Sequence, residues 1–392
     1  MSASDTPYLF IDTVDELTVF CDSLKGESWL ALDTEFIREK TYYPLLCLLQ
    51  VGVPGNIACI DPIAIDDMSP LFDILYDRNI VKVIHSCSQD LEIFAYLQGE
   101  IPAPIFDTQL AAPLLGFPEQ VGYANFVREI LGITLDKSQT RTDWSRRPLA
   151  PEQLAYAADD VRYLGEIYPA FRDKLKEKGR LEWLDAEFAQ YEKVERYIHK
   201  PEQAWQRIRG LEKLRSKALS ILQVLAAWRE AIAQEKNLPR SWVLKDDALV
   251  DIARIAPTSL DKLGAIRNFP PRTLDRYGEI IIKHVAEAEE RSPEPLPPGK
   301  RRTRPTADED AMADILQAHL RVLAEKYQIN SASLASRKEL VALAQGEENI
   351  PLLKGWRHKM AGVELLAMRD GKRKLTVADG RVVISGADQG NY

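Results

Sequence analysis

Residues 29–36 are Trp-Leu-Ala-Leu-Asp-Thr-Glu-Phe, a short and largely apolar stretch that contains two acids. An apolar stretch of this length is typical of a buried β-strand. Side chains along a strand alternate between its two faces, so Asp33 and Glu35 face the same side. Two neighbouring acids on a buried strand are costly unless cations or protons neutralise them. The pair therefore predicts a cation site, unless one acid pairs with an arginine or lysine and the other lies at the strand edge.

Strand-like and helix-like segments alternate around this stretch. Further strands are expected at 45–53 and 56–60, which Pro54-Gly55 joins by a turn, and at 81–85. Helical periodicity is found at residues 66–76, 88–97, 108–115, 122–131 and 151–175. This alternation predicts an α/β domain with a largely buried central sheet over residues 1–200.

The helix expected from Pro151 contains a tyrosine and an acid one turn apart. Tyr156 and Asp160 lie about 40° apart on a helical wheel, so their side chains point together. The apolar stripe of the helix is expected on the other side, and a solvent-exposed polar face is the plain alternative. Asp159 is a near-equal candidate by its angle to Tyr156, and the sequence does not choose between the two aspartates.

A fourth acid, Asp90, follows the strand 81–85 after a short connection. Ser88 could cap a helix there, which would place Asp90 in the first turn, where an acid also compensates the helix dipole. The set as a whole is more informative than any member. Acids from a strand, a strand-to-helix corner and a helix of one domain suit two hard divalent cations, which prefer oxygen ligands.

The C-terminal half of the chain is expected to be helical in two further units. The first covers residues 204–291, and residues 292–310 combine five prolines with a basic and then an acidic stretch, which predicts an extended linker. The second unit covers residues 311–392. Near its end, Ala378-Asp379-Gly380 separates two apolar stretches and predicts a small β-hairpin.

Charge is distributed unevenly along the chain. The whole chain has a net charge of −8, but residues 1–200 have a net charge of −14, and residues 201–300 and 301–392 each have +3. This asymmetry predicts a division of labour between an acidic first domain and mildly basic later units. The start of the chain lacks the pattern of a secretory signal, and no apolar stretch approaches the length of a membrane span. The four cysteines form no C-x-x-C pair, which predicts a reduced, cytoplasmic protein.

Three motifs resemble those of a known superfamily. D-T-E-F at 33–36, H-S-C-S-Q-D at 85–90 and Y-A-A-D-D at 156–160 resemble the exonuclease motifs of the DEDD superfamily, and the spacing Y-x-x-x-D marks its tyrosine branch. T-Y-Y-P at 41–44, F-D-T-Q-L-A-A at 106–112 and D-W-S-R-R-P-L at 143–149 point to the ribonuclease D family within it. Residues 204–291 resemble an HRDC domain, and residues 311–392 a divergent second one. The resemblance implies an α/β ribonuclease H-like exonuclease domain with a central mixed sheet, followed by two small all-α HRDC-like domains.

The resemblance also implies a set of residue roles. Two divalent cations, Mg²⁺ or Mn²⁺, would lie between Asp33, which bridges both, and the other acids. Glu35 and Asp160 would complete the first cation site, and Asp90 would hold the second. Tyr156 would orient the attacking water. The expected activity is 3′–5′ release of nucleoside 5′-monophosphates from RNA with an accessible 3′ end, tRNA precursors above all, by a monomer.

Two other functions are compatible with the sequence. A 3′–5′ DNA exonuclease would use the same acids, since only contacts to the 2′-hydroxyl separate RNA from DNA. A catalytically idle RNA-binding scaffold would not need the intact set of five residues. Metal-dependent release of mononucleotides would separate the scaffold from both enzymes.

Six further residues are predicted to contact substrate: Thr34, Phe36, His85, Lys137, Trp144 and Arg147. Thr34 and Phe36 flank the acids, and the basic stretch around Trp144 suits single-stranded nucleic acid. Each has a structural alternative. Phe36 could belong to the core, His85 could be a histidine with satisfied hydrogen bonds, and the basic stretch could be a solvated loop.

Overall fold

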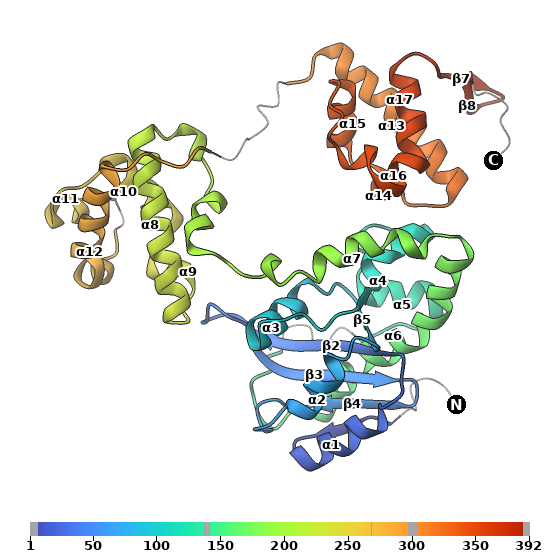
Figure 1. The fold of residues 1–392 in the computed structure, drawn as a ribbon, viewed down its shortest axis with the longest axis horizontal. Coiled ribbons are helices and arrows are strands. Elements are labelled where there is room, and N and C mark those ends of the chain that lie inside the picture. Colours follow the sequence, from blue (N-terminus) through green and yellow to red (C-terminus); the bar gives the residue numbers. More distant parts are fainter. Residues whose placement is uncertain (1–6, 137–138, 140–141, 268, 297–303, 387–392) are drawn as a thin grey trace.

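A six-stranded mixed sheet forms the centre of the N-terminal half of the chain (Figure 1). The computed structural model describes residues 7–136, 139, 142–267, 269–296 and 304–386. The strands lie in the order β1-β4-β3-β2-β5-β6, and β3 is antiparallel to both of its neighbours, whereas all other pairs are parallel. Their bounds are β1 (Leu9–Ile11), β2 (Trp29–Ile37), β3 (Leu45–Val53), β4 (Asn56–Ile60), β5 (Val81–Ile84) and β6 (Ile105–Asp107). The four predicted strands are confirmed, while β1 and β6 are too short to show a pattern in the sequence.

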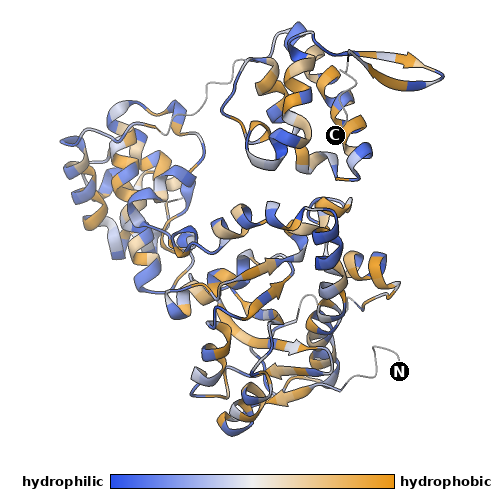
Figure 2. Cartoon of the chain, turned by 45° about the vertical axis from the view of Figure 1, so that its right-hand side comes forward, coloured by the Kyte–Doolittle hydropathy of each residue, from blue (hydrophilic) through white to orange (hydrophobic). Residues whose placement is uncertain are grey.

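In the described part of this half, the sheet is surrounded by α-helices, and the long helix α6 packs across β2, β3 and β4. They are α1 (Val14–Ser23), α2 (Ser69–Leu75), α3 (Ser88–Gln98), α4 (Thr108–Ala111), α5 (Tyr123–Leu131), α6 (Pro151–Glu177) and α7 (Asp185–Tyr191). Figure 2 shows the central strands as largely hydrophobic. This agrees with a sheet covered by helices, whose strands are apolar on both faces.

The orientation of α6 differs from the prediction in one respect. Ala157, Val161 and Leu164 are buried as expected and form the stripe that faces the sheet. Asp160 is three residues after Ala157, so it lies at the margin of this packed stripe and not on the opposite side. The helix therefore turns one flank of its apolar stripe, with Asp160 on it, toward β2.

The first helical unit has its own hydrophobic core. Its helices are α8 (Ser216–Glu235), α9 (Arg240–Val243), α10 (Asp246–Ile255), α11 (Leu260–Gly264) and α12 (Pro271–Glu289). Tyr42, from the connection between β2 and β3, is buried in this core. The backbone N–H groups of Tyr42 and Tyr43 donate to the side-chain oxygen of Asn237, each over 3.0 Å. The loop that follows β2 is therefore held by the first helical unit.

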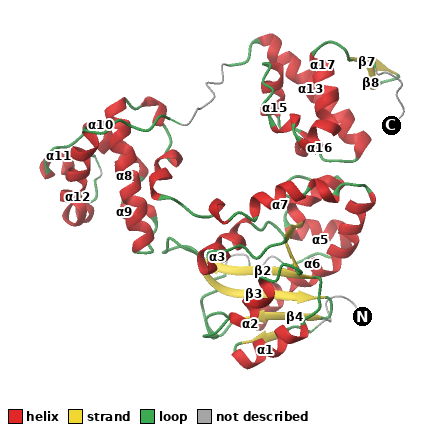
Figure 3. Cartoon of the chain, viewed as in Figure 1, coloured by secondary structure: helices red, strands yellow, loops and turns green. Residues whose placement is uncertain are grey.

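The second helical unit ends in a two-stranded sheet, and Figure 3 separates both helical units from the strand-rich half. Its elements are α13 (Ala307–Tyr327), α14 (Ser331–Leu334), α15 (Arg337–Ala344), α16 (Gly355–Arg357), α17 (Val363–Arg369), β7 (Lys374–Ala378) and β8 (Arg381–Ser385). Asp379 and Gly380 both have positive φ, as the predicted hairpin turn requires. The predicted linker 292–310 is too long at its end. Thr306 and Glu309 form a capping box that starts α13 at Ala307.

Contacts also join the second helical unit to the N-terminal half of the chain. The rings of Trp183 and Trp356 stack with centroids 5.0 Å apart. The backbone N–H of Asn330 donates to the carbonyl of Pro113 over 3.0 Å.

Among the described residues, no helix has both the length and the apolar composition to cross a membrane. The domain boundaries at residues 200, 204 and 291 stay a prediction.

Candidate active site

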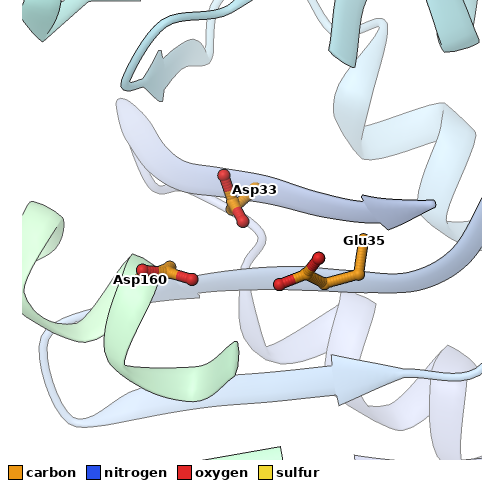
Figure 4. A group of neighbouring side chains, drawn as sticks. All are labelled: Asp33, Glu35 and Asp160. Atoms are coloured by element: carbon orange, nitrogen blue, oxygen red, sulfur yellow. The ribbon is translucent and has the colours of Figure 1, made fainter. Parts of the chain in front are cut away.

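Three carboxylates from two elements meet above the central sheet (Figure 4). Asp33 and Glu35 lie two residues apart on β2, and Asp160 approaches them from α6. One carboxylate oxygen of each lies within 4.8 Å of one oxygen of the other two. All three residues are half-buried. The strand alternation thus placed two acids on one face, and the packing of α6 added the third.

Burial and mutual repulsion disfavour the charged forms of these carboxylates. Burial, followed by the charges of Asp160 and Asp90, raises the pKa of Glu35 to about 9. Burial and Asp90 raise the pKa of Asp160 to about 7, and burial with the neighbouring acids raises the pKa of Asp33 well above its usual value. No lysine or arginine is among the main causes of these shifts. A divalent cation would supply the missing positive charge with the oxygen ligands that it prefers, so the residues fit a metal site.

Asp90 lies beside this group but outside its closest set. It occupies the first turn of α3, is 6% exposed, and accepts a hydrogen bond from the hydroxyl of Thr34. Burial raises the pKa of Asp90 to about 7, although the hydrogen bond from Thr34 acts in the opposite direction. The charge of Asp90 in turn raises the pKa of Asp33, Glu35 and Asp160. The fourth acid is thus close enough to interact with all three.

The geometry also decides between the two adjacent aspartates of α6. The carboxylate of Asp159 pairs with Arg162, whereas that of Asp160 faces Asp33 and Glu35. Tyr156, one turn earlier, is half-buried. Burial, and then the charge of Asp160, raises the pKa of the Tyr156 hydroxyl above its usual value. That hydroxyl therefore stays protonated near neutral pH and can donate a hydrogen bond.

A cleft of about 510 Å³ opens beside Tyr156 and Asp160. Its other wall is formed by Tyr123 and Asn125 at the start of α5, and by Asp136. The hydroxyl of Tyr123 donates to the carbonyl of Asp159 over 2.8 Å, which ties α5 to α6 across the base of the cleft. The volume is in the range of pockets that bind small molecules. The acids therefore lie next to a space that a nucleotide could enter.

Comparison with known proteins places this site in a family. The family model described as 3′-5′ exonuclease matches residues 8–176, and the HRDC domain model matches residues 218–285. Ribonuclease D of Sphingobium indicum is 39% identical over 93% of this chain and 95% of its own. Ribonuclease D of Gluconacetobacter diazotrophicus is 38% identical over 95% and 96%. The chain belongs to the ribonuclease D family.

A solved structure supports the same assignment. The crystal structure of Escherichia coli RNase D, described as an exoribonuclease involved in structured RNA processing, has 32% identity and a TM-score of 0.78. It covers 93% of this chain and 99% of its own. The expected family, the exonuclease domain with a central mixed sheet and the helical C-terminal region with an HRDC domain are thereby confirmed. As a member of the ribonuclease D family, the chain is a 3′–5′ exoribonuclease.

Within this ribonuclease D family chain, the predicted substrate contacts next to the acids have mixed outcomes. Thr34 is buried and uses its hydroxyl on Asp90. Phe36 is half-buried and packs against the core of the nuclease domain. Lys137 lies outside the described residues. Neither Thr34 nor Phe36 presents a free polar group to the cleft among the contacts that the structure describes.

His85 and Trp144 are placed as structural residues. Both ring nitrogens of His85 have partners, the hydroxyl of Thr108 at 2.9 Å and the carbonyl of Val121 at 2.8 Å. Trp144 is 4% exposed and lies behind Tyr156, with ring centroids 6.3 Å apart. Trp144 was predicted to contact substrate, but in this structure the protein covers its ring. The sequence shows the residue type but not which groups surround it.

Arg147 is also occupied within the protein. Its guanidinium donates to both carboxylate oxygens of Asp61 and to the backbone carbonyls of Cys47, Trp144 and Arg146. These five hydrogen bonds use all five N–H donors of an arginine. In this structure no donor is left for a phosphate, and Arg147 anchors the segment before α6.

Sequence reasoning missed Gln50. It is the one amide in the apolar strand β3, and it lies directly opposite Asp33 in the sheet. A polar side chain inside an otherwise apolar strand is a signal that could have drawn attention to it.

Proposed function

We propose that this 3′–5′ exoribonuclease uses two divalent cations, Mg²⁺ or Mn²⁺, to remove nucleoside 5′-monophosphates one at a time from the 3′ end of RNA. One observation carries the proposal. Asp33, Glu35 and Asp160 lie within 4.8 Å of one another and repel one another, with burial and other acids as the main causes of their raised pKa values. Such an arrangement is unfavourable in itself and becomes favourable with cations bound.

Each acid has a proposed place in the site. Asp33, Glu35 and Asp160 would hold one cation, and Asp33 and Asp90 would hold the second. When bound, two such cations stabilise the charge that develops on the attacking and leaving oxygens of a phosphodiester. Thr34 keeps the carboxylate of Asp90 turned toward β2 by the hydrogen bond that its hydroxyl donates. The chain itself therefore supplies ligands and their orientation.

Tyr156 has a separate role in this proposal. Its raised pKa makes it a poor base but a good hydrogen-bond donor. It lines the cleft beside Asp160, so its hydroxyl can orient the water that attacks the terminal phosphodiester. The cleft beside it would take the 3′-terminal nucleotide.

The substrate in the cell would be RNA with an accessible 3′ end, tRNA precursors above all, and the protein would act as a cytoplasmic monomer. Residues 204–291 and 311–392 would act as HRDC-like domains that contact the body of the RNA. For the first of these units, one feature supports this role. A second cleft, of about 730 Å³, lies between the nuclease domain and the first helical unit, and Arg207 and Lys245 line it together with acids such as Glu92 and Asp246.

A time course on 5′-labelled RNA with a short unpaired 3′ tail tests the proposal, with Mg²⁺, with Mn²⁺ and with EDTA, beside the same sequence as DNA. We expect a ladder of single-nucleotide steps on RNA that EDTA abolishes. Asp160→Asn should abolish the ladder, whereas Asp159→Asn, the matched control one residue away, should retain it. A ladder that persists in EDTA, or in Asp160→Asn, would contradict the metal assignment. A DNA ladder of equal rate would overturn the preference for RNA.

A further inference from the structure

Gln50 is a buried amide without hydrogen-bond partners. Its side chain is 0% exposed, and neither its oxygen nor its nitrogen has a partner among the described residues. Buried side-chain polar atoms are rarely left in this state, and each case calls for a specific explanation. One such explanation is that the amide has its partner only when the protein binds an ion or another ligand.

The position of Gln50 indicates what that explanation is. In the antiparallel pairing of β2 and β3, Gln50 is directly opposite Asp33, and on the other side it is opposite Cys59 of β4. Residues that are directly opposite in an antiparallel sheet have side chains on the same face, with Cβ atoms about 4.5–5.5 Å apart. Cys59 contacts the carbonyl of Leu154 in α6 through its sulfur, so this face is the one that α6 covers. The amide of Gln50 therefore lies under α6, beside the carboxylate of Asp33.

Packing alone does not account for an amide at this position. Leu48, which shares its face of β3 with Gln50, is fully buried and apolar, and a side chain such as methionine has the same length as glutamine. An apolar side chain would fill the space without leaving two polar atoms unsatisfied. What the amide adds is a pair of N–H donors within reach of an acid that the proposed function makes a metal ligand.

We infer that Gln50 is a positioning residue that donates a hydrogen bond to the Asp33 carboxylate when cations are bound. Carboxylates that ligate metals are themselves hydrogen-bonded by surrounding groups, which fix their orientation. The amide of Gln50 makes no hydrogen bond in this structure, although it lies opposite Asp33 on the same face of the sheet. Bound cations would fix the orientation of the Asp33 carboxylate, which would then be a defined acceptor for the amide. This inference rests on the proposed function, because it requires Asp33 to bind a cation.

The inference makes opposite predictions for stability and for metal binding. Gln50→Met keeps the length of the side chain and removes the amide. Without metal, its melting temperature should rise by about 2–6 °C, because an unsatisfied buried amide is gone. Its affinity for Mn²⁺, measured by isothermal titration calorimetry, should fall by about 10- to 100-fold. A residue that only supports the fold would show the reverse pattern, a lower melting temperature and unchanged affinity.

Leu48→Met is the matched control. Leu48 lies on the same strand and face, is fully buried, and is opposite Glu35. It should leave Mn²⁺ affinity within about twofold of wild type, since the substitution conserves volume and removes no polar group. If wild type binds Mn²⁺ and Gln50→Met binds it equally well, the inference is overturned while the proposed function stands. If wild type binds no Mn²⁺ and yields no RNA ladder, the proposed function fails and the inference falls with it.

Discussion

Buried acids occur in two regions of this molecule and are treated differently in each. In the first helical unit, Glu230 is 1% exposed, its carboxylate lies 2.6 Å from Nε of Arg240, and the hydroxyl of Tyr42 donates to it. In the nuclease domain, Asp33, Glu35 and Asp160 face one another, and burial and other acids are the main causes of their raised pKa values. In the first region an arginine supplies the counter-charge of the buried acid. In the second region no lysine or arginine is among the main causes of the pKa shifts, and ionisation of the acids is unfavourable.

The nuclease domain itself also contains a compensated acid. Asp61 is buried, and its two carboxylate oxygens accept hydrogen bonds from Nε and Nη2 of Arg147. A bidentate pair of this kind satisfies a buried carboxylate well. In these two places, an arginine neutralises a buried acid that has a structural role. The acids on β2 and α6 have no such arginine partner among the main causes of their pKa shifts. This difference indicates that a bound cation neutralises them.

The largest expected effect is on catalysis. Asp33→Asn removes the acid proposed to bridge both cations and should lower the rate of RNA cleavage by about 1,000-fold or more, the order seen when one electrostatic stabiliser is lost. It also removes one of the repelling charges, so the metal-free protein should unfold at the same temperature or higher. Single-turnover cleavage and calorimetry measure the two quantities. A variant with normal turnover would contradict the role of Asp33.

The compensated region should show the reverse. Glu230→Gln leaves Arg240 without its counter-charge in a largely buried setting and should lower the free energy of unfolding by about 2–4 kcal/mol. The Mg²⁺ concentration that gives half-maximal cleavage should stay as in wild type, because no ligand is changed. Chemical denaturation and a Mg²⁺ titration measure both. If Glu230→Gln changed the Mg²⁺ concentration for half-maximal cleavage strongly and left the free energy of unfolding unchanged, Glu230 would belong to the metal site and the comparison would fail.

The pH dependence of stability should separate the metal-free from the metal-bound protein. The acids of the cluster have raised pKa values in the folded state, about 7 for Asp90 and Asp160 and about 9 for Glu35. Their stabilising contribution is complete below the unfolded-state pKa of about 4 and is lost as pH rises through about 7 and then about 9. The metal-free melting temperature should thus fall over this range. Saturating Mg²⁺ should flatten the curve, and a curve of equal slope with and without Mg²⁺ would count against a cation site.

The smallest expected effect concerns the contact between the two regions. Tyr42→Phe removes the hydroxyl that donates to Glu230 and should cost about 1–2 kcal/mol of stability. Cleavage of a short single-stranded RNA by the folded variant should be unchanged, because the aromatic ring still fills the core of the first helical unit. Thermal melting and the RNA time course provide the two readings. A loss of cleavage equal to that of Asp33→Asn would place Tyr42 in the site.

The sequence was sufficient for features that depend on periodicity. The alternation in β2 put Asp33 and Glu35 on one face, and the central strands, the long helix α6 and the hairpin turn at Asp379-Gly380 all follow from local patterns. Strands of three residues, such as β1 and β6, offer no period to detect.

The sequence could not predict features that depend on how separate elements pack together. Asp159 and Asp160 lie on either side of the direction of Tyr156 on a helical wheel. Only the pairing of Asp159 with Arg162 and the placement of α6 on β2 separate their roles. Arg147 and Trp144 are residue types that often contact nucleic acids. In this protein, however, Arg147 binds Asp61 and Trp144 is buried. Gln50 acquires meaning only from the register that puts it opposite Asp33. The set of acids was thus predictable, and the residues that surround them were not.

Calorimetric titration of Mn²⁺ at pH 7.5 tests the central claim most directly, with wild type, Asp33→Asn and Glu230→Gln compared side by side. If the uncompensated cluster is the cation site, wild type and Glu230→Gln will bind Mn²⁺ with similar affinity, and Asp33→Asn will have lost most of it. Equal binding by all three proteins, or none by wild type, would contradict the account.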